Sequence, residues 1–305
     1  MPRRPARDDC GGTRGAGGEA PVDTIRSMGP GDVDFALQLT SSEGWGFVRK
    51  DFSRLLDLTP GGSHIALVNG RRVGILTTIR HRESCWIGNV VVAPSFRRSG
   101  IGRRLVNSAL EHASNLGIKR VGLISRAGTV GFYDALGFSK GPRIIGMGGM
   151  PALPGDLGPD EEIVPVSREL LPEVMRLDKE CACDDRGPML ASFMRDFGRH
   201  FLVHLKKGEV DGFIVGKPGA QRLEIGPWTI SRGDRKAAGA LFAALVSKRP
   251  GPVEVYIPEG ERWALGFLEA SGLKKENRFV EMIIGGRRKR SEKVQALAPA
   301  GLEKG

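Results

Sequence analysis

Hydrophobic positions early in the chain recur at the spacing of amphipathic helices. Val48, Phe52 and Leu55 fall on one face of such a helix, which predicts that Trp45–Leu56 is helical. The segment Gly31–Leu39 starts with Asp32, a plausible N-cap, and predicts a shorter helix before it. The N-terminal part of the fold is therefore expected to begin with two helices.

Shorter apolar runs bounded by turn residues follow, and each has the length of a strand. These predicted strands are His64–Asn69, Val73–Thr78, Ser84–Val92 and Arg120–Ile124. A helical pattern over Ile101–Leu116 separates the last two strands and completes a β–α–β unit. Small antiparallel strands that lead into such a unit indicate an α/β (α+β) domain, with a mixed, mostly antiparallel sheet flanked by helices.

The second half of the chain repeats this order of elements. The predicted strands are Leu202–Leu205, Val210–Val215, Arg222–Ile230 and Val253–Ile257, and the predicted helices are Asp234–Leu245 and Arg262–Ala270. Short identities lie at matching places: Ile87-Gly88 corresponds to Ile225-Gly226, and Gly131-Phe132 corresponds to Gly266-Phe267. A repeat of this length predicts tandem domains and not a solenoid.

These patterns divide the chain into two domains with three connecting or terminal segments. The predicted division is a disordered leader (1–22), a first domain (23–145), a linker rich in Gly and Pro (146–161), a second domain (162–286) and a basic tail (287–305). The start of the linker, Gly146–Met150, has two interpretations. It is either the last strand of the first domain or a strand exchanged between the two copies.

Composition restricts the class of protein. The chain has 305 residues and is 40% apolar, which is enough for two modest cores. No apolar run reaches the roughly 18–20 residues of a membrane span, and the leader lacks the apolar core of a secretory signal. The cysteines lie neither in a disulfide framework nor at zinc-site spacing. We therefore expect reduced thiols, no metal site, no membrane partner and a cytoplasmic location. The cysteines are Cys10, Cys85, Cys181 and Cys183.

The net charge of +11 is concentrated toward the two ends of the chain. Arg3, Arg4 and Arg7 lie near the start, and a basic run occupies residues 287–290. Basic ends can bind nucleic acid through its phosphates. Neither a recognition helix nor an aromatic stacking platform accompanies them, so nucleic acid is disfavoured as a partner. Salt-dependent binding that disappears when both ends are removed would support it.

A glycine-containing turn joins the predicted strand Ser84–Val92 to the helix that follows it. Its sequence, Arg97-Arg98-Ser99-Gly100-Ile101-Gly102, places arginines beside the free backbone N–H groups of a helix N-terminus. Gly100 and Gly102 have no side chain to keep an anion away from these groups. The turn predicts a phosphate or pyrophosphate site, although it matches neither the Walker A motif nor the dinucleotide fingerprint.

A short predicted helix with a tyrosine follows the next strand. The segment reads Gly131-Phe132-Tyr133-Asp134-Ala135-Leu136-Gly137-Phe138. The order strand, R-x-x-G-x-G turn, helix, strand, short helix and L-G-F resembles the GNAT acetyltransferase superfamily. The resemblance is good over Ser63–Phe138 and extends back to Asp23. With its second half, the chain resembles tandem GNAT proteins whose second domain is a divergent copy.

The resemblance implies acetyl-CoA as the co-substrate. In that family the strand before the turn splays from its neighbour and pairs with the pantetheine arm, while the turn amides hold the pyrophosphate. The tyrosine, here Tyr133, would lie near the thioester sulfur and protonate the leaving thiolate. The residues implied to bind the coenzyme are Val90, Val91, Val92, Arg97, Arg98, Ser99, Gly100, Ile101, Gly102 and Arg126.

Some positions depart from the family pattern. Arg126 stands where many relatives carry asparagine, and Arg98 stands where glycine is common. In the second copy the turn has become Arg235-Lys236-Ala237-Ala238-Gly239-Ala240, and Leu268 replaces the tyrosine. We therefore expect no second intact coenzyme site. The second domain is expected to wall off one side of the acceptor cleft, because binding sites favour domain interfaces.

An acceptor amine must lose a proton before it can attack a thioester. Glu43, in a glycine-flanked loop between the first two predicted helices, is the candidate general base, and a backbone carbonyl or a water chain is the alternative. The expected activity is N-acetyl transfer to a primary amine, of a small molecule or a peptide, by direct attack in a ternary complex. The alternative function is a non-catalytic module that senses acyl-CoA or docks a partner.

Overall fold

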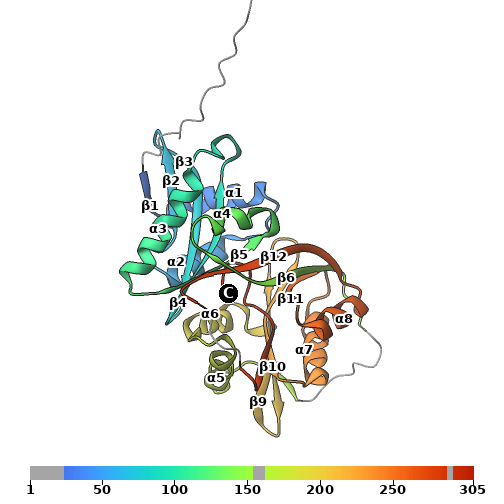
Figure 1. Ribbon diagram of the computed structural model, residues 1–305. Coiled ribbons are helices and arrows are strands. Elements are labelled where there is room, and N and C mark those ends of the chain that lie inside the picture. The colour runs from blue at the N-terminus through green and yellow to red at the C-terminus, as the bar shows by residue number, and fades with distance from the viewer. Residues whose placement is uncertain (1–23, 154–161, 287–290) are drawn as a thin grey trace, which may run out of the picture.

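The computed structural model describes residues 24–153, 162–286 and 291–305 (Figure 1). These residues form two α/β domains that share one sheet of 13 strands. The leader predicted at 1–22, the second half of the linker predicted at 146–161 and the basic run 287–290 lie outside the described residues.

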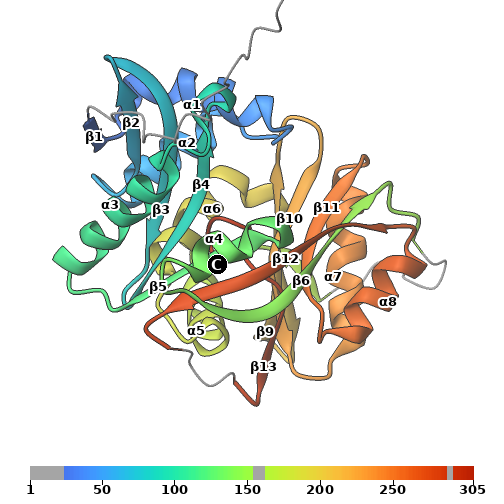
Figure 2. The ribbon, with the colours of Figure 1, turned by 45° about the horizontal axis from the view of Figure 1, so that its top comes forward.

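The first domain has the predicted order of elements, preceded by one strand, β1, that was not predicted. Its strands are β1 (Thr24–Ser27), β2 (His64–Val68), β3 (Arg71–Arg80), β4 (Ser84–Val92) and β5 (Arg120–Arg126), and its helices are α1 (Val33–Ser42), α2 (Arg49–Leu58), α3 (Ile101–Asn115) and α4 (Val130–Asp134). Helices α3 and α4 cover one face of the sheet, where Leu105 and Phe138 are buried. Helices α1 and α2 cover the other face, where Phe52 and Ile75 are buried (Figure 2).

The second helix begins later than the sequence predicted. The prediction placed its start at Trp45, but α2 begins at Arg49 because Val48 has an extended backbone. The N–H of Val48 donates to the carboxylate of Asp51 at 2.9 Å, a contact typical of a helix N-terminus. The residues before Val48 therefore belong to the loop that contains Glu43.

The second domain repeats the order of the first. Its strands are β7 (Ile163–Pro165), β8 (Phe201–Lys206), β9 (Glu209–Pro218), β10 (Leu223–Ser231) and β11 (Val253–Pro258), and its helices are α5 (Leu171–Ala182), α6 (Gly187–Phe197), α7 (Arg235–Lys248) and α8 (Arg262–Ala270). Strands β10 and β11 are parallel, as β4 and β5 are in the first domain. The domains pack against each other where Leu55 of α2 and Ile79 of β3 join the core around Phe193 of α6.

The two domains exchange strands. Strand β6 (Ser139–Gly149) leaves the first domain and pairs with β11, while β12 (Lys274–Ile284) leaves the second and pairs with β5. The two exchanged strands also pair with each other and cross the centre of the molecule (Figure 1). Residues 146–149 are therefore part of an exchanged strand, which was one of the two predicted interpretations, and the predicted start of the linker at Gly146 is wrong.

The end of the chain is also ordered where a basic tail was predicted. Strand β13 (Val294–Ala298) pairs antiparallel with β10, and Leu297 and Ala298 join the core of the second domain. The prediction of a tail over 287–305 is therefore wrong for residues 294–305. The basic run before it led to the prediction of a tail, although a short apolar strand follows that run.

Candidate active site

Strand β4 separates from its parallel neighbour β5 halfway along its length. The two strands pair from Ser84 with Arg120 to Ile87 with Leu123, and no pairing follows among the described residues. Asn89 lies just beyond this point with φ of +51° and donates to the hydroxyl of Thr77 at 3.0 Å. From Gly88 to Val92, β4 thus keeps β3 on one side and has an unpaired edge toward β5.

The predicted coenzyme valines follow Asn89 on this unpaired edge. Val91 is buried under α1 and α2, whereas Val90 and Val92 are partly buried on the face covered by α3. Because their backbone has no strand partner toward β5, it can accept an extended, amide-bearing ligand as an added strand.

The turn between β4 and α3 leaves the helix N-terminus open. Gly100 is its N-cap with φ of +80°, and no side chain caps the first turn. The first intrahelical donor is Arg104, whose N–H bonds to the carbonyl of Gly100 at 3.1 Å. The N–H groups of Ser99, Gly100, Ile101 and Gly102 precede it and meet no acceptor in the described part of the chain. Such groups, with exposed arginines beside them, suit a phosphate.

Arg97 braces the turn against the strand before it. Its Nε donates to the carbonyl of Val92 at 2.9 Å, and its guanidinium forms an ion pair with Glu43. The hydroxyl of Ser99 also donates to the carbonyl of Phe96 at 2.5 Å. The structure thus joins Glu43, predicted as the base, to Arg97, predicted as a coenzyme residue.

Tyr133 lies on α4 among aromatic and aliphatic side chains. It is 9% exposed, and its ring makes edge contacts with Phe132 and Phe138 at centroid distances of 4.9 and 6.0 Å. Burial raises the pKa of Tyr133 to about 12, so the hydroxyl keeps its proton at neutral pH. Helix α4 contacts β5, the strand from which β4 separates. This placement is compatible with the predicted role of Tyr133 as a proton donor.

Arg126 ends β5 and reaches toward the loop between α1 and α2. Its guanidinium carbon lies 5.8 Å from the ring centroid of Trp45. Trp45 belongs to the same loop as Glu43, so this contact connects Arg126, at the end of β5, to the loop that contains Glu43.

The second domain has the same separation of strands, but its own chain fills it. Pairing of β10 with β11 stops at Ile225, the counterpart of Ile87, and β13 then pairs with β10 from Trp228 to Ser231. At the start of α7 the carboxylate of Asp234 accepts the N–H of Ala237 at 3.1 Å. In the second domain, therefore, the strand edge is paired with β13 and the helix N-terminus is capped by Asp234. Leu268, at the position of Tyr133, is fully buried.

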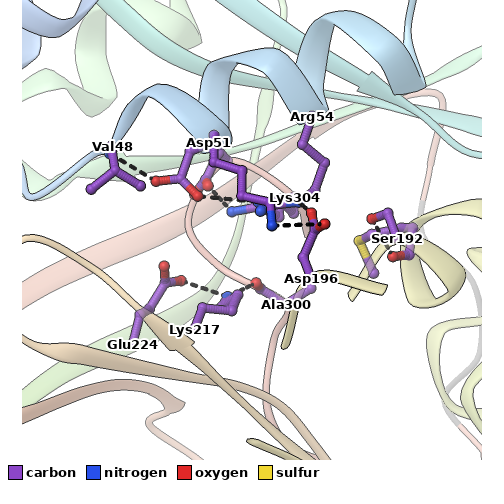
Figure 3. Close-up of polar contacts among 12 residues, drawn as sticks. Val48, Asp51, Arg54, Ser192, Asp196, Lys217, Glu224, Ala300 and Lys304 are labelled. Carbon is purple, nitrogen blue, oxygen red and sulfur yellow. Dashed lines mark hydrogen bonds and ion pairs between the residues drawn. The ribbon is translucent and has the colours of Figure 1, made fainter. Parts of the chain in front are cut away.

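A group of buried charges between the domains was not predicted (Figure 3). The Nε of Arg54 on α2 donates to Asp196 of α6 at 2.9 Å, and Lys217 of β9 donates to Glu224 of β10 at 2.8 Å. Lys217 also donates to the carbonyl of Ala300, just beyond β13. In the sequence these residues are isolated charges on unrelated elements, so only the packing of the domains reveals them.

The described residues contain neither a cluster of metal ligands nor a membrane-spanning helix. No group of three or more histidine, cysteine, aspartate or glutamate side chains in them is arranged to hold a metal ion. None of their helices is both long and apolar enough to cross a membrane.

Comparisons with known proteins agree with this geometry. The profile of the acetyltransferase (GNAT) family matches residues 34–138, and that of a second acetyltransferase (GNAT) domain matches residues 174–297. Over 137 residues the chain is 31% identical to an uncharacterized N-acetyltransferase of Methanocaldococcus jannaschii. That alignment covers 38% of this chain and 61% of the relative.

Longer alignments have lower identity. The chain is 22% identical to the holothin acyltransferase of a Pseudoalteromonas species over 87% of its own length and 88% of the relative's. The crystal structure of a protein from Pyrococcus horikoshii, assigned as an acetyltransferase, superposes with a TM-score of 0.76 at 21% identity. It covers 92% of this chain and 95% of that one.

A tandem GNAT protein from the clavulanic acid biosynthesis pathway has a similar fold. It superposes with a TM-score of 0.59 at 18% identity, over 87% of this chain and 99% of that one. At such identities the structural likeness concerns the fold alone. The two family matches, one in each half, show that the chain belongs to the GNAT family of acyltransferases and carries two GNAT domains.

Proposed function

We propose that this protein transfers an acetyl group from acetyl-CoA to an amine, and that only the first domain binds the coenzyme. The observation that carries the proposal is the unpaired edge of β4 beside an uncapped helix N-terminus. An extended arm that carries amides can hydrogen-bond to the unpaired strand edge, and a pyrophosphate can accept from the free N–H groups of the helix N-terminus. Coenzyme A has both chemical parts in one molecule.

The coenzyme would be held by residues of β4 and of the turn that follows. The pantetheine arm would add to the strand at Val90–Val92, and the pyrophosphate would accept from the N–H groups of Ser99–Gly102. Arg97, Arg98 and Arg126 would supply positive charge around it. A Cβ at position 102 would lie 3.6 Å from Phe132, in ordinary contact, so packing within the protein does not require glycine there. A glycine at this position is instead consistent with a ligand that approaches the backbone closely.

The reaction would proceed by direct attack. Holding the amine and the thioester together supplies most of the acceleration. The lone pair of the amine forms the bond to the carbonyl carbon, the carbon–sulfur bond breaks, and Tyr133 protonates the sulfur. A phenol that stays protonated at neutral pH suits this step. Glu43 is the base candidate from the sequence, but it is engaged with Arg97.

The proposal can be tested without knowing the acceptor. Calorimetry with acetyl-CoA should show one binding site per chain, and a panel of amines should release free thiol from acetyl-CoA. Failure to bind acetyl-CoA would overturn the proposal. Binding without transfer to any amine would favour the alternative, a module that senses acyl-CoA.

A further inference from the structure

Residues 299–305 cross from the second domain to the first. They continue from β13 and end in the centre of the molecule, where the C label lies beside α6 and β4 in Figure 1. Three side chains of this segment are buried: Ala300 is fully buried, Glu303 is 5% exposed and Lys304 is 3% exposed. This segment, which we call the crossing segment, therefore forms part of the interdomain core.

The crossing segment lies against β4 at the point where β4 leaves β5. A Cβ on Gly88 would overlap the Cβ of Glu303, and a Cβ on Gly305 would overlap the ring of Trp86. Gly88 follows Ile87, the last residue of β4 that pairs with β5. Trp86 packs in the core shared with the second domain, not with α3. The segment thus covers the face of β4 opposite α3.

Polar contacts fix the crossing segment in place. His81 donates from Nε2 to the carbonyl of Lys304 at 3.1 Å, and Arg186 donates to the carbonyl of Gly305 at 2.6 Å. Arg186 is itself held by Asp178 through two bonds of 2.6 and 2.9 Å. Because these anchors are buried, the segment is a fixed part of the interdomain core.

Two carboxylates and an ammonium group lie close to Gly301 of the crossing segment. A Cβ on Gly301 would lie 2.7 Å from Oε1 of Glu224, 3.1 Å from Oε2 of Glu303 and 3.3 Å from Nζ of Lys304. Glu303 also forms an ion pair with Lys304. An alkylammonium, that of Lys304, thus already lies among these carboxylates beside β4.

We propose that the crossing segment is the acceptor-side wall of the first domain's active site, and that Glu303 binds the acceptor ammonium there and takes its proton. The inference rests on the proposed function and adds a substrate class, a cationic amine, and a proton acceptor other than Glu43. Glu303 occupies the space that a side chain at position 88 of β4 would fill, because Gly88 has no side chain there.

The proton balance of the step is simple. One proton of the acceptor ammonium passes to Glu303 and then to water, which frees the lone pair for attack. The new carbon–nitrogen bond forms as the carbon–sulfur bond breaks with its electron pair on sulfur. A second proton leaves nitrogen, and one proton is taken up by sulfur. The net products are the amide, the free thiol of coenzyme A and one released proton.

An affinity label tests the location without an acceptor. Bromoacetyl-CoA carries an electrophilic carbon where the acetyl group of acetyl-CoA would lie. We expect Glu303 to displace its bromide and form an ester, or Lys304 to displace it and form a secondary amine. Mass spectrometry of the digested full chain should find the label within residues 299–305, and excess acetyl-CoA should prevent it.

Substitution of Glu303 tests the chemistry. Glu303→Gln keeps the shape of the side chain and should lower amine acetylation at pH 7 by about a hundredfold or more, as loss of a general base does. Its affinity for acetyl-CoA should stay within about twofold of wild type, since the turn is untouched. Glu292→Gln, an exposed change just before β13, is the matched control and should keep full activity.

Glu303→Gln leaves Lys304 buried without its partner, which can prevent folding. The double variant Glu303→Gln with Lys304→Met removes both charges and should fold, bind acetyl-CoA and still fail to acetylate amines. More than half of wild-type activity in either folded variant would overturn the proposal, as would a label found only outside residues 299–305. A wild-type protein that does not bind acetyl-CoA would overturn the proposed function itself.

Discussion

The two domains of this protein share a fold, and in both of them two parallel strands separate partway along their length. The domains differ in what lies in the space between these strands. In the first, β4 leaves β5 after Ile87 and its edge stays unpaired, whereas in the second, β10 leaves β11 after Ile225 and β13 fills the edge. The start of α3 has no side-chain cap, whereas Asp234 caps α7. A fold that leaves strand edges and helix ends unpaired needs a partner for them, either a ligand or more chain.

Separating the two domains should have the largest effect. A chain that ends at residue 153 lacks β12, so β5 and β6 lose the strand that joins them. We expect such a chain to show no cooperative unfolding transition in circular dichroism. Production together with residues 162–305 should restore both the transition and coenzyme binding. A cooperative transition in the isolated first half would show that the domains fold independently.

Removing the hydroxyl of Tyr133 should slow the reaction without weakening coenzyme binding. For Tyr133→Phe we expect turnover to fall about a hundredfold, because the leaving thiolate loses its proton donor. The matched control is Tyr256→Phe, which changes the other tyrosine of the chain, on β11. Turnover close to wild type for Tyr133→Phe would remove that residue from the mechanism.

The pH profile gives a second measure of Tyr133. Since its pKa is raised to about 12, the proton-bearing form persists throughout the neutral and mildly alkaline range. Wild-type turnover should therefore show no loss attributable to this residue below about pH 11. A fall near the ordinary phenol pKa of about 10 that vanishes in Tyr133→Phe would contradict the effect of burial.

A side chain at Gly100 should weaken coenzyme binding more moderately. Gly100→Val places a β-branched residue at φ of +80° and covers the amides of the turn. We expect the Kd for acetyl-CoA to rise at least about tenfold in calorimetry. Gly117→Val imposes similar backbone strain at φ of +72°, with open space around the new side chain, and should bind like wild type. Equal losses in both variants would indicate general destabilisation.

Removing the cap of α7 should have the smallest effect. Asp234→Ala should lower the free energy of unfolding by about 1 kcal/mol in urea titration, as the loss of an N-cap does. The matched control is Asp57→Ala on α2, an exposed change expected to stay within about 0.5 kcal/mol. Coenzyme binding by the first domain should be unaffected in both. A gain of coenzyme binding at α7 would show that capping alone had closed the second site.

The contribution of Asp234 should also depend on pH. The hydrogen bond from Lys206 and the N–H of Ala237 lower the pKa of Asp234 below its ordinary 3.8. A carboxyl with a lower pKa in the folded state stabilises fully above its unfolded pKa and loses that effect as pH falls through the folded value. The difference between wild type and Asp234→Ala should therefore be constant at neutral pH and shrink below about pH 4.

The sequence predicted the elements from β2 to β5 and from β8 to α8 because their signals are local, whereas β1, β7, α5 and α6 were not predicted. Periodicity located β4 and α3, and glycines marked the turn between them. The family resemblance of the first half and the divergent repeat of the second are confirmed by the two family matches. The roles of Tyr133, Glu43 and the coenzyme residues stay predictions.

What the sequence did not reveal depends on contacts between distant segments. Strand β13 is a short apolar run after basic residues, and only its pairing with β10 identifies it as a strand. Glu43 could not be recognised as the partner of Arg97, because a loop carboxylate gives no sign of what it will meet. Glu303 was passed over for the same reason. Its place beside Gly88 depends on how the whole second domain folds.

The exchange of β6 and β12 has a consequence for synthesis of the protein. Strand β5 is complete at Arg126, but its partner β12 is complete only at Ile284, about 160 residues later. At roughly 5–20 residues per second, a nascent chain holds this edge bare on the ribosome for on the order of ten seconds. During that interval chaperones or a neighbouring nascent copy can reach it, so this part of the sheet is completed only after residue 284 has been translated.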